Sequence, residues 1–208
     1  MNDETPFRIL LIFVSVVQTV ISLRYLKKAK AGSTIFRRRE EGILLSIAIV
    51  VFYLAYGVAV VTYFLNPNWM AWSAFVVPSW IRWVGIVPLL FGAFWIIWGL
   101  HHIGDNITVS IKTREDHALI TTGPYHWVRH PLYAAGIIES VGVCLMMANW
   151  FVAISAGLFW TLIALRTPME EQKLIEKFGD KYCRYMQRVG RFMPRIDRAV
   201  NAKNQGKE

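Results

Sequence analysis

The 208-residue sequence has few charged residues: they make up 18% of the chain, whereas 55% is hydrophobic and the mean hydropathy is +0.37. This balance excludes a disordered chain and argues against an ordinary water-soluble domain. Acidic residues are scarcer than basic ones, 14 against 23, which gives a formal net charge of +9. Such a charge suits nucleic acid or an anionic membrane surface. The hydrophobicity favours the membrane.

Residues typical of metal sites and soluble nucleotide sites are also few. The two cysteines, Cys144 and Cys183, lie 39 positions apart, one in an apolar run and one in a basic segment. Neither a CxxC metal site nor a disulfide scaffold is therefore indicated, and we predict two free thiols. GxG, GKS and GKT do not occur, so a Rossmann domain is not indicated. His126 and His130 are four positions apart, but Pro131 disfavours a helix there and the glutamate of HExxH is missing. We therefore predict no metal site.

Long apolar runs predict an all-α integral membrane protein. A bilayer core about 30 Å thick needs roughly 20 apolar residues in a helix, because lipid offers the backbone no hydrogen-bond partners. The runs are 7–26, 43–65, 80–100 and 131–165. Pro88 should kink the third helix about one turn upstream. The last run is too long for one span, and a break at 148–150 divides it into two short antiparallel helices, which gives about five spans.

Charge placement predicts the orientation of these helices. The connector from 27 to 42 and the segment after Leu165 are rich in basic residues, whereas residues 66–79 hold no charge. Because cytoplasmic loops collect Lys and Arg, we expect both basic segments in the cytoplasm and the N-terminus outside, which an odd number of spans allows. Asp3 and Glu4 make a cleavable signal peptide a poor fit.

This topology divides the chain into three regions. We expect an N-terminal two-span membrane region at 1–79, a core at 80–198 and a flexible tail at 199–208. The core contains two cytoplasmic segments, 101–130 and 166–198, which flank the helical hairpin on the same side. Catalytic chemistry is expected in these two segments.

The first informative segment is HALITTGPYHWVRHPLYAAG, residues 117–136. It places turn residues, tyrosines, a histidine and an arginine directly before the apolar hairpin, as a loop folded onto a membrane entrance would. Its composition alone equally fits an interfacial belt of Tyr and Trp.

The second informative segment, residues 166–194, has apolar residues at helical spacing that are interrupted at Gly179. This pattern predicts an amphipathic helix or two short ones. Arg166 and Glu170 share one helix face if Pro168 occupies the first turn, and a structural ion pair between them is the simplest interpretation.

Together these segments resemble the isoprenylcysteine carboxyl methyltransferase family and its wider relatives, which include phospholipid N-methyltransferases. The shared signature is RHPxYxG followed by a Glu-Glu pair. Here it reads RHPLYAA at 129–135, with Glu170 and Glu171 later in the chain. The sequence departs from the signature at Ala135, where the family usually has glycine, and this difference bears on close backbone packing. The resemblance extends over about residues 80–196.

The resemblance implies an S-adenosylmethionine-dependent methyltransferase and assigns roles to matching residues. The cofactor site would comprise His117, Leu119, Ile120, Tyr125, His130, Pro131, Leu132, Tyr133 and Glu170. Arg166 matches the arginine that orients the substrate, so Arg166 and Glu170 are the expected catalytic residues. Arg129 is expected to brace the loop.

The chemistry of methyl transfer fits these residue types. A sulfonium donor is cationic, which suits the aromatic faces of Tyr125 and Tyr133, and its reaction needs alignment and exclusion of water. A carboxylate acceptor is already an anion, and Arg166 can hold it by two hydrogen bonds. An amine or a thiol would need a base, and His130 alone is a candidate. Carboxyl O-methylation of a lipophilic, isoprenylcysteine-like substrate is therefore favoured.

Glu139 is the remaining candidate for a substrate contact. It lies about two turns into the fourth span, at a depth where a carboxylate is costly and marks function by default. We expect it either to face the substrate cavity or to pair with a polar neighbour inside the bundle.

Other functions stay open at this point. Phospholipid N-methylation or thiol S-methylation would use the same donor site. An NADPH-dependent sterol-type reductase and a non-catalytic membrane adaptor belong to different classes, and the Glu-Glu pair argues against the reductase. The expected partners are a lipophilic or lipid-attached substrate and membrane lipid, without nucleic acid or metal.

Overall fold

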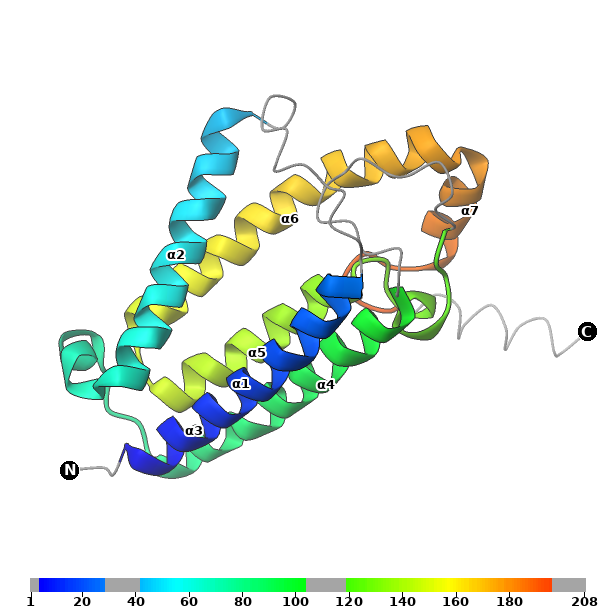
Figure 1. Cartoon of the computed structure of the whole chain (residues 1–208). Coiled ribbons are helices and arrows are strands. Elements are labelled where there is room, and N and C mark those ends of the chain that lie inside the picture. Colours follow the sequence, from blue (N-terminus) through cyan, green and yellow to red (C-terminus); the bar gives the residue numbers. More distant parts are fainter. Residues whose placement is uncertain (1–3, 29–41, 104–118, 196–208) are drawn as a thin grey trace, which may run out of the picture.

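The computed structural model describes residues 4–28, 42–103 and 119–195, and these ranges are helical, without strands. The elements are α1 (Thr5–Lys28), α2 (Ile43–Leu65), the 3-10 helix η1 (Pro67–Ser73), α3 (Ser79–Val84), α4 (Ile86–Ile103), the 3-10 helix η3 (Gly123–His126), α5 (Pro131–Met147), α6 (Trp150–Phe178) and α7 (Asp180–Arg188). The expected all-α fold is confirmed (Figure 1). His117 and most of the basic connector from 27 to 42 lie outside the described residues.

The chain is a multi-pass membrane protein. Four helical stretches of the described chain are long and apolar enough to cross a bilayer: α1, α2, α3 together with α4, and α6. The apolar helix α5 has 17 residues and is therefore about 26 Å long, somewhat less than the hydrocarbon thickness. All five expected helices are present, and their number as full spans stays a prediction.

The predicted break between the last two apolar helices is confirmed at Ala148 and Asn149. Ala148 adopts a left-handed conformation with φ of 47°, which ends α5. The Asn149 side chain accepts a hydrogen bond from the Val152 N–H and donates to the Ser73 hydroxyl at 2.8 Å. It therefore caps α6 and joins it to η1 at the same time. From this turn α5 and α6 diverge (Figure 1).

Glycines allow α4 and α5 to pack closely along their length (Figure 1). A Cβ atom at Gly92 would lie only 2.6 Å from the Glu139 Cβ and 2.8 Å from the Ala135 carbonyl oxygen. Ala135, the departure from the family signature, is fully buried. The backbones of α4 and α5 therefore still approach closely at Ala135, because the glycine at this contact is Gly92 of α4.

The helix break expected upstream of Pro88 is found at Gly85, three residues before it.

A buried polar group closes the end of the bundle at which α1 begins. Arg82 donates to both carboxylate oxygens of Glu4, at 2.7 and 2.6 Å, and to the Met146 carbonyl at 2.8 Å. The Tyr63 hydroxyl also donates to Glu4, at 2.7 Å. These four residues form the Arg82 cluster, which joins the start of α1 to the ends of α2 and α5.

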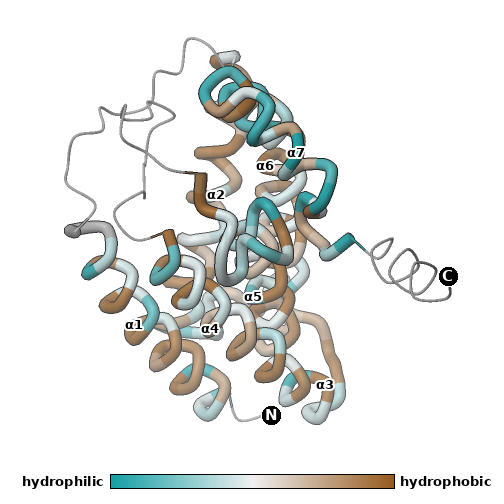
Figure 2. Tube along the Cα trace, turned by 90° about the vertical axis from the view of Figure 1, so that its right-hand side faces the viewer, coloured by the Kyte–Doolittle hydropathy of each residue, from teal (hydrophilic) through white to brown (hydrophobic). Residues whose placement is uncertain are grey.

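The segment after Leu165 continues α6 as far as Phe178, so the expectation that Pro168 occupies a first helical turn is wrong. Pro168 is exposed inside α6, and contacts of the following glutamates with α5 and its loop hold the helix beyond it. Gly179, with φ of 55°, then turns the chain into α7. The two helices predicted around Gly179 are thus confirmed. Figure 2 shows hydrophilic residues gathered at α7 and the end of α6.

Candidate active site

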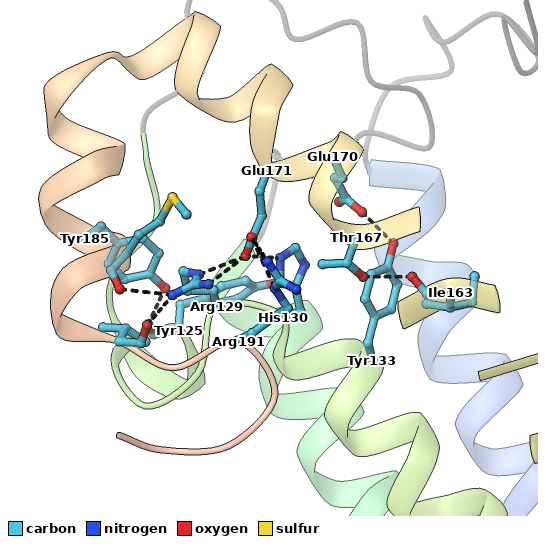
Figure 3. Close-up of polar contacts among 12 residues, drawn as sticks. Tyr125, Arg129, His130, Tyr133, Ile163, Thr167, Glu170, Glu171, Tyr185 and Arg191 are labelled. Carbon is cyan, nitrogen blue, oxygen red and sulfur yellow. Dashed lines mark hydrogen bonds and ion pairs between the residues drawn. The ribbon is translucent and has the colours of Figure 1, made fainter. Parts of the chain in front are cut away.

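Glu171 lies at the centre of a network of cationic groups (Figure 3). One carboxylate oxygen accepts from the Arg129 Nε at 2.9 Å and lies 3.2 Å from the His130 Nε2. The other oxygen accepts from Arg191 at 2.6 Å. The side chain of Glu171 is only 3% exposed, so two guanidinium groups keep a buried carboxylate ionised. These four residues are named the Glu171 cluster.

Backbone contacts make the Glu171 cluster a junction of three segments. Arg129 also donates to the carbonyls of Met186 and Val189, at the end of α7. The Arg129 N–H donates to the Gly190 carbonyl at 2.8 Å, and the next N–H donates to the Arg191 carbonyl at 3.0 Å. The expectation that Arg129 braces the loop is confirmed. The loop before α5, the charged part of α6 and the chain after α7 are held together here.

Glu170, the neighbour of Glu171, points to a different group of residues (Figure 3). It is half-buried and accepts a hydrogen bond from the Tyr133 hydroxyl at 3.0 Å. The Tyr133 ring is parallel to the His130 ring, with 5.5 Å between the ring centres. Arg166 lies one turn earlier on α6 and is also half-buried. A carboxylate and two aromatic rings thus lie together where α5 begins.

The tyrosines beside this site are neutral hydrogen-bonding groups. The Tyr185 hydroxyl donates to the Tyr125 carbonyl at 2.5 Å and so joins α7 to η3. Burial first, and then the nearby Tyr185 and Glu170, raise the pKa of Tyr125 above its ordinary value. Burial likewise raises the pKa of Tyr185. Neither phenol ionises at physiological pH, so neither adds negative charge near Glu170.

The structure brings only some of the expected cofactor residues together. Tyr125, His130, Tyr133 and Glu170 lie around one corner, through the contacts given above. Leu132, by contrast, packs over Gly99 of α4.

For the other expected residues, no contact with this corner is established. Pro131 is buried in the first turn of α5, and Ile120 is half-buried in the loop. Leu119 packs against an apolar cluster that includes Tyr182 and Tyr185 of α7.

Glu139 pairs with a polar neighbour, which is one of its two expected settings. The Gln18 side chain of α1 donates to its carboxylate at 3.0 Å. One residue further along α5, Ser140 accepts from the Trp160 indole at 2.9 Å. A contact of Glu139 with substrate stays a prediction.

Sequence reasoning missed Arg191 and underrated Glu171. The doubled glutamate was the available signal for Glu171, because two adjacent carboxylates on one helix point in different directions. No group of three or more metal-ligating side chains occurs within the described ranges. Both cysteines are free thiols.

Comparison with known proteins agrees with this geometry. Residues 83–176 match the isoprenylcysteine carboxyl methyltransferase (ICMT) family. The match contains the RHPLY motif and both glutamates of the site, so the resemblance of the two segments to ICMT is confirmed.

Curated relatives of the ICMT type match the same part of the chain. Protein-S-isoprenylcysteine O-methyltransferase B of Arabidopsis thaliana is 39% identical over 90 residues, which cover 43% of this chain and 46% of the relative. Protein-S-isoprenylcysteine O-methyltransferase of Homo sapiens is 32% identical over 115 residues, which cover 54% of this chain and 40% of the relative. The chain thus spans less than half the length of these relatives.

A solved ICMT structure has the same fold. The eukaryotic intramembrane Ras methyltransferase ICMT superposes with a TM-score of 0.53 at 21% identity, over 88% of this chain and 67% of that one. This likeness covers more of the chain than the family match and supports the helical membrane architecture as a whole.

Proposed function

We propose that the chain transfers a methyl group from S-adenosylmethionine to a lipophilic acceptor at the membrane, by carboxyl O-methylation of an isoprenylcysteine-like substrate. The observation that carries this proposal is the contact of Glu170 of α6 with Tyr133 of α5, whose ring lies parallel to that of His130, the residue just before α5. Arg166 lies one turn before Glu170 on the same helix. The ICMT relatives are isoprenylcysteine O-methyltransferases by name, which agrees with this acceptor class.

The residues of this corner fit a sulfonium cofactor. Aromatic faces attract a cation, and a half-buried carboxylate can accept hydrogen bonds from the amino or ribose groups of such a molecule. We assign these roles to Tyr125, Tyr133 and Glu170, with His117, Leu119, Ile120, His130, Pro131 and Leu132 completing the predicted site. When bound, S-adenosylmethionine supplies a methyl group that a carboxylate anion accepts without losing a proton.

Arg166 is proposed to hold the acceptor carboxylate. It lies one turn before Glu170 on α6, and a planar guanidinium matches a carboxylate in two parallel hydrogen bonds, which supports this assignment. No general base is required for this acceptor. His130 is already engaged with the buried Glu171, which makes it poorly placed to deprotonate an amine or a thiol.

The membrane location fits a lipid-attached acceptor. We propose that the acceptor enters between the helices, that Glu139 contributes to the polar lining deeper in the bundle, and that the loop before α5 and the C-terminus are cytoplasmic. The N-terminus would then lie outside.

The test is methyl transfer from labelled S-adenosylmethionine to N-acetyl-S-prenylcysteine by the detergent-purified protein. We expect the ester to form with the wild-type chain. Arg166→Gln should raise KM for this acceptor by roughly tenfold or more, because it removes a charge-assisted pair of hydrogen bonds. Arg24→Gln, which removes an exposed arginine of α1, should leave KM unchanged.

Phosphatidylethanolamine and a prenyl thiol serve as competing acceptors. Methylation of either in preference to the carboxylate would overturn the acceptor assignment. Saturable NADPH binding without S-adenosylhomocysteine binding would overturn the methyltransferase proposal.

A further inference from the structure

A pocket lies between η3 with its preceding loop and α7. Its volume is about 340 Å³. It is lined by Leu119, Thr121, His126, Lys181, Arg184, Tyr185, Arg188 and Val189. Three of these side chains are permanently cationic and come from a single helix.

The three cations of the pocket are held there by the folding of α7. Tyr182 and Tyr185 point inward and pack against Leu174 and Phe178 of α6, as an amphipathic helix requires. Lys181, Arg184 and Arg188 occupy the opposite, exposed face of α7 and line the pocket. Within the described ranges, no ion pair joins these three residues to an acidic side chain. Among the residues that the structure describes, the pocket is therefore a concentration of basic side chains without an ion-pair partner.

One end of the pocket lies near the start of the apolar helix α5. The chain directly after Arg188 is hydrogen-bonded to Arg129 and His130, the residues that precede the apolar helix α5. Trp127, beside His126, is 53% exposed, and an exposed Trp at the end of an apolar helix is typical of the headgroup level. Met193 is also exposed there. We therefore expect Arg188 and His126 to lie at the level of the phospholipid phosphates if α5 enters the bilayer at its first turn.

We propose that this pocket binds the headgroup of an anionic phospholipid, with the phosphate held by Arg184 and Arg188. Guanidinium groups match phosphate oxygens in paired hydrogen bonds, and basic pockets at the ends of membrane helices attract anionic headgroups. Such a lipid would hold α7 against the loop that carries Tyr125. This proposal does not depend on the methyltransferase function.

The test measures binding of dioctanoyl phosphatidylglycerol and dioctanoyl phosphatidylcholine to the full chain in neutral detergent, by native mass spectrometry. We expect the wild-type protein to retain phosphatidylglycerol at one site and to bind it at least tenfold more tightly than phosphatidylcholine. Arg184→Gln with Arg188→Gln should abolish this preference. Arg184→Lys with Arg188→Lys should retain most of it, because the charge stays.

The matched control removes the same charge elsewhere. Arg24→Gln with Lys177→Gln lowers the net charge by two units outside the pocket and should keep the preference for phosphatidylglycerol. An equal loss in this control and in the Arg184 and Arg188 variant would overturn the proposal, since attraction would then depend on net charge alone.

Two further outcomes would also overturn it. If inorganic phosphate displaces phosphatidylglycerol at equal concentration, the ligand of the pocket is a soluble anion and not a lipid. If S-adenosylhomocysteine displaces the lipid in competition, the pocket belongs to the cofactor site, with which it shares the Leu119 side chain.

Discussion

Two clusters of guanidinium and carboxylate groups lie at opposite ends of α5 and differ in how deeply their carboxylate is buried. The Arg82 cluster pairs one arginine with Glu4, whose side chain is 33% exposed. The Glu171 cluster places two arginines and a histidine on a carboxylate that is 3% exposed. The first joins the start of α1 to the ends of α2 and α5. The second fixes α6 so that the adjacent Glu170 faces Tyr133. The same type of ion pair thus joins helix ends at one end of the bundle and positions a candidate site at the other.

The largest effect on stability is expected at Glu171. Glu171→Gln leaves two guanidinium groups next to a neutral amide in a buried place, which should cost about 3–5 kcal/mol of unfolding free energy. The measurement is the thermal midpoint in detergent, with the exposed Glu176→Gln on the same helix as control. Midpoints that agree for the two variants would show that the Glu171 cluster does not hold the site together.

A smaller loss is expected at the other end of α5. Arg82→Met breaks the pair with Glu4, but Glu4 is partly exposed and can turn to water, so we expect about 1–3 kcal/mol. Affinity for S-adenosylhomocysteine, measured by titration, should not change. A loss of affinity as large as that of a site variant would remove the distinction between the two clusters.

A still smaller effect is expected next to the Arg82 cluster. Arg8 donates to the carbonyls of Phe64 and Leu65 at the end of α2, at 2.8 and 3.0 Å. Arg8→Gln should therefore lower stability by about 1 kcal/mol, since these carbonyls are the negative end of a helix. Arg24→Gln is the control at the opposite end of α1, and an equal shift of the thermal midpoint in both variants would contradict the assignment.

Features that depend on local chemistry could be predicted from the sequence. The break at Asn149, the helix interruption before Pro88 and the turn at Gly179 follow from backbone preferences of the residues themselves. The family motif likewise pointed to Tyr133 and Glu170, which lie in contact.

Features that depend on distant contacts could not be predicted. Arg82 and Glu4 are 78 positions apart, and only the assembled bundle brings them together. Arg191 reaches Glu171 because α7 turns back along α6. Pro168 predicted a helix start from its local preference, whereas contacts of the following glutamates keep it inside α6.

The central claim, that Glu171 supports the site and Glu170 acts in it, is tested most directly by Glu170→Gln. The measurement is isothermal titration of S-adenosylhomocysteine into the purified protein, together with its thermal midpoint. We predict that Glu170→Gln changes stability less than Glu171→Gln, Arg82→Met or Arg8→Gln, since Glu170 is half-buried. Its affinity for S-adenosylhomocysteine should fall roughly tenfold or more. Unchanged affinity with a lowered midpoint would contradict the account, because Glu170 would then be a structural residue and the site would lie elsewhere.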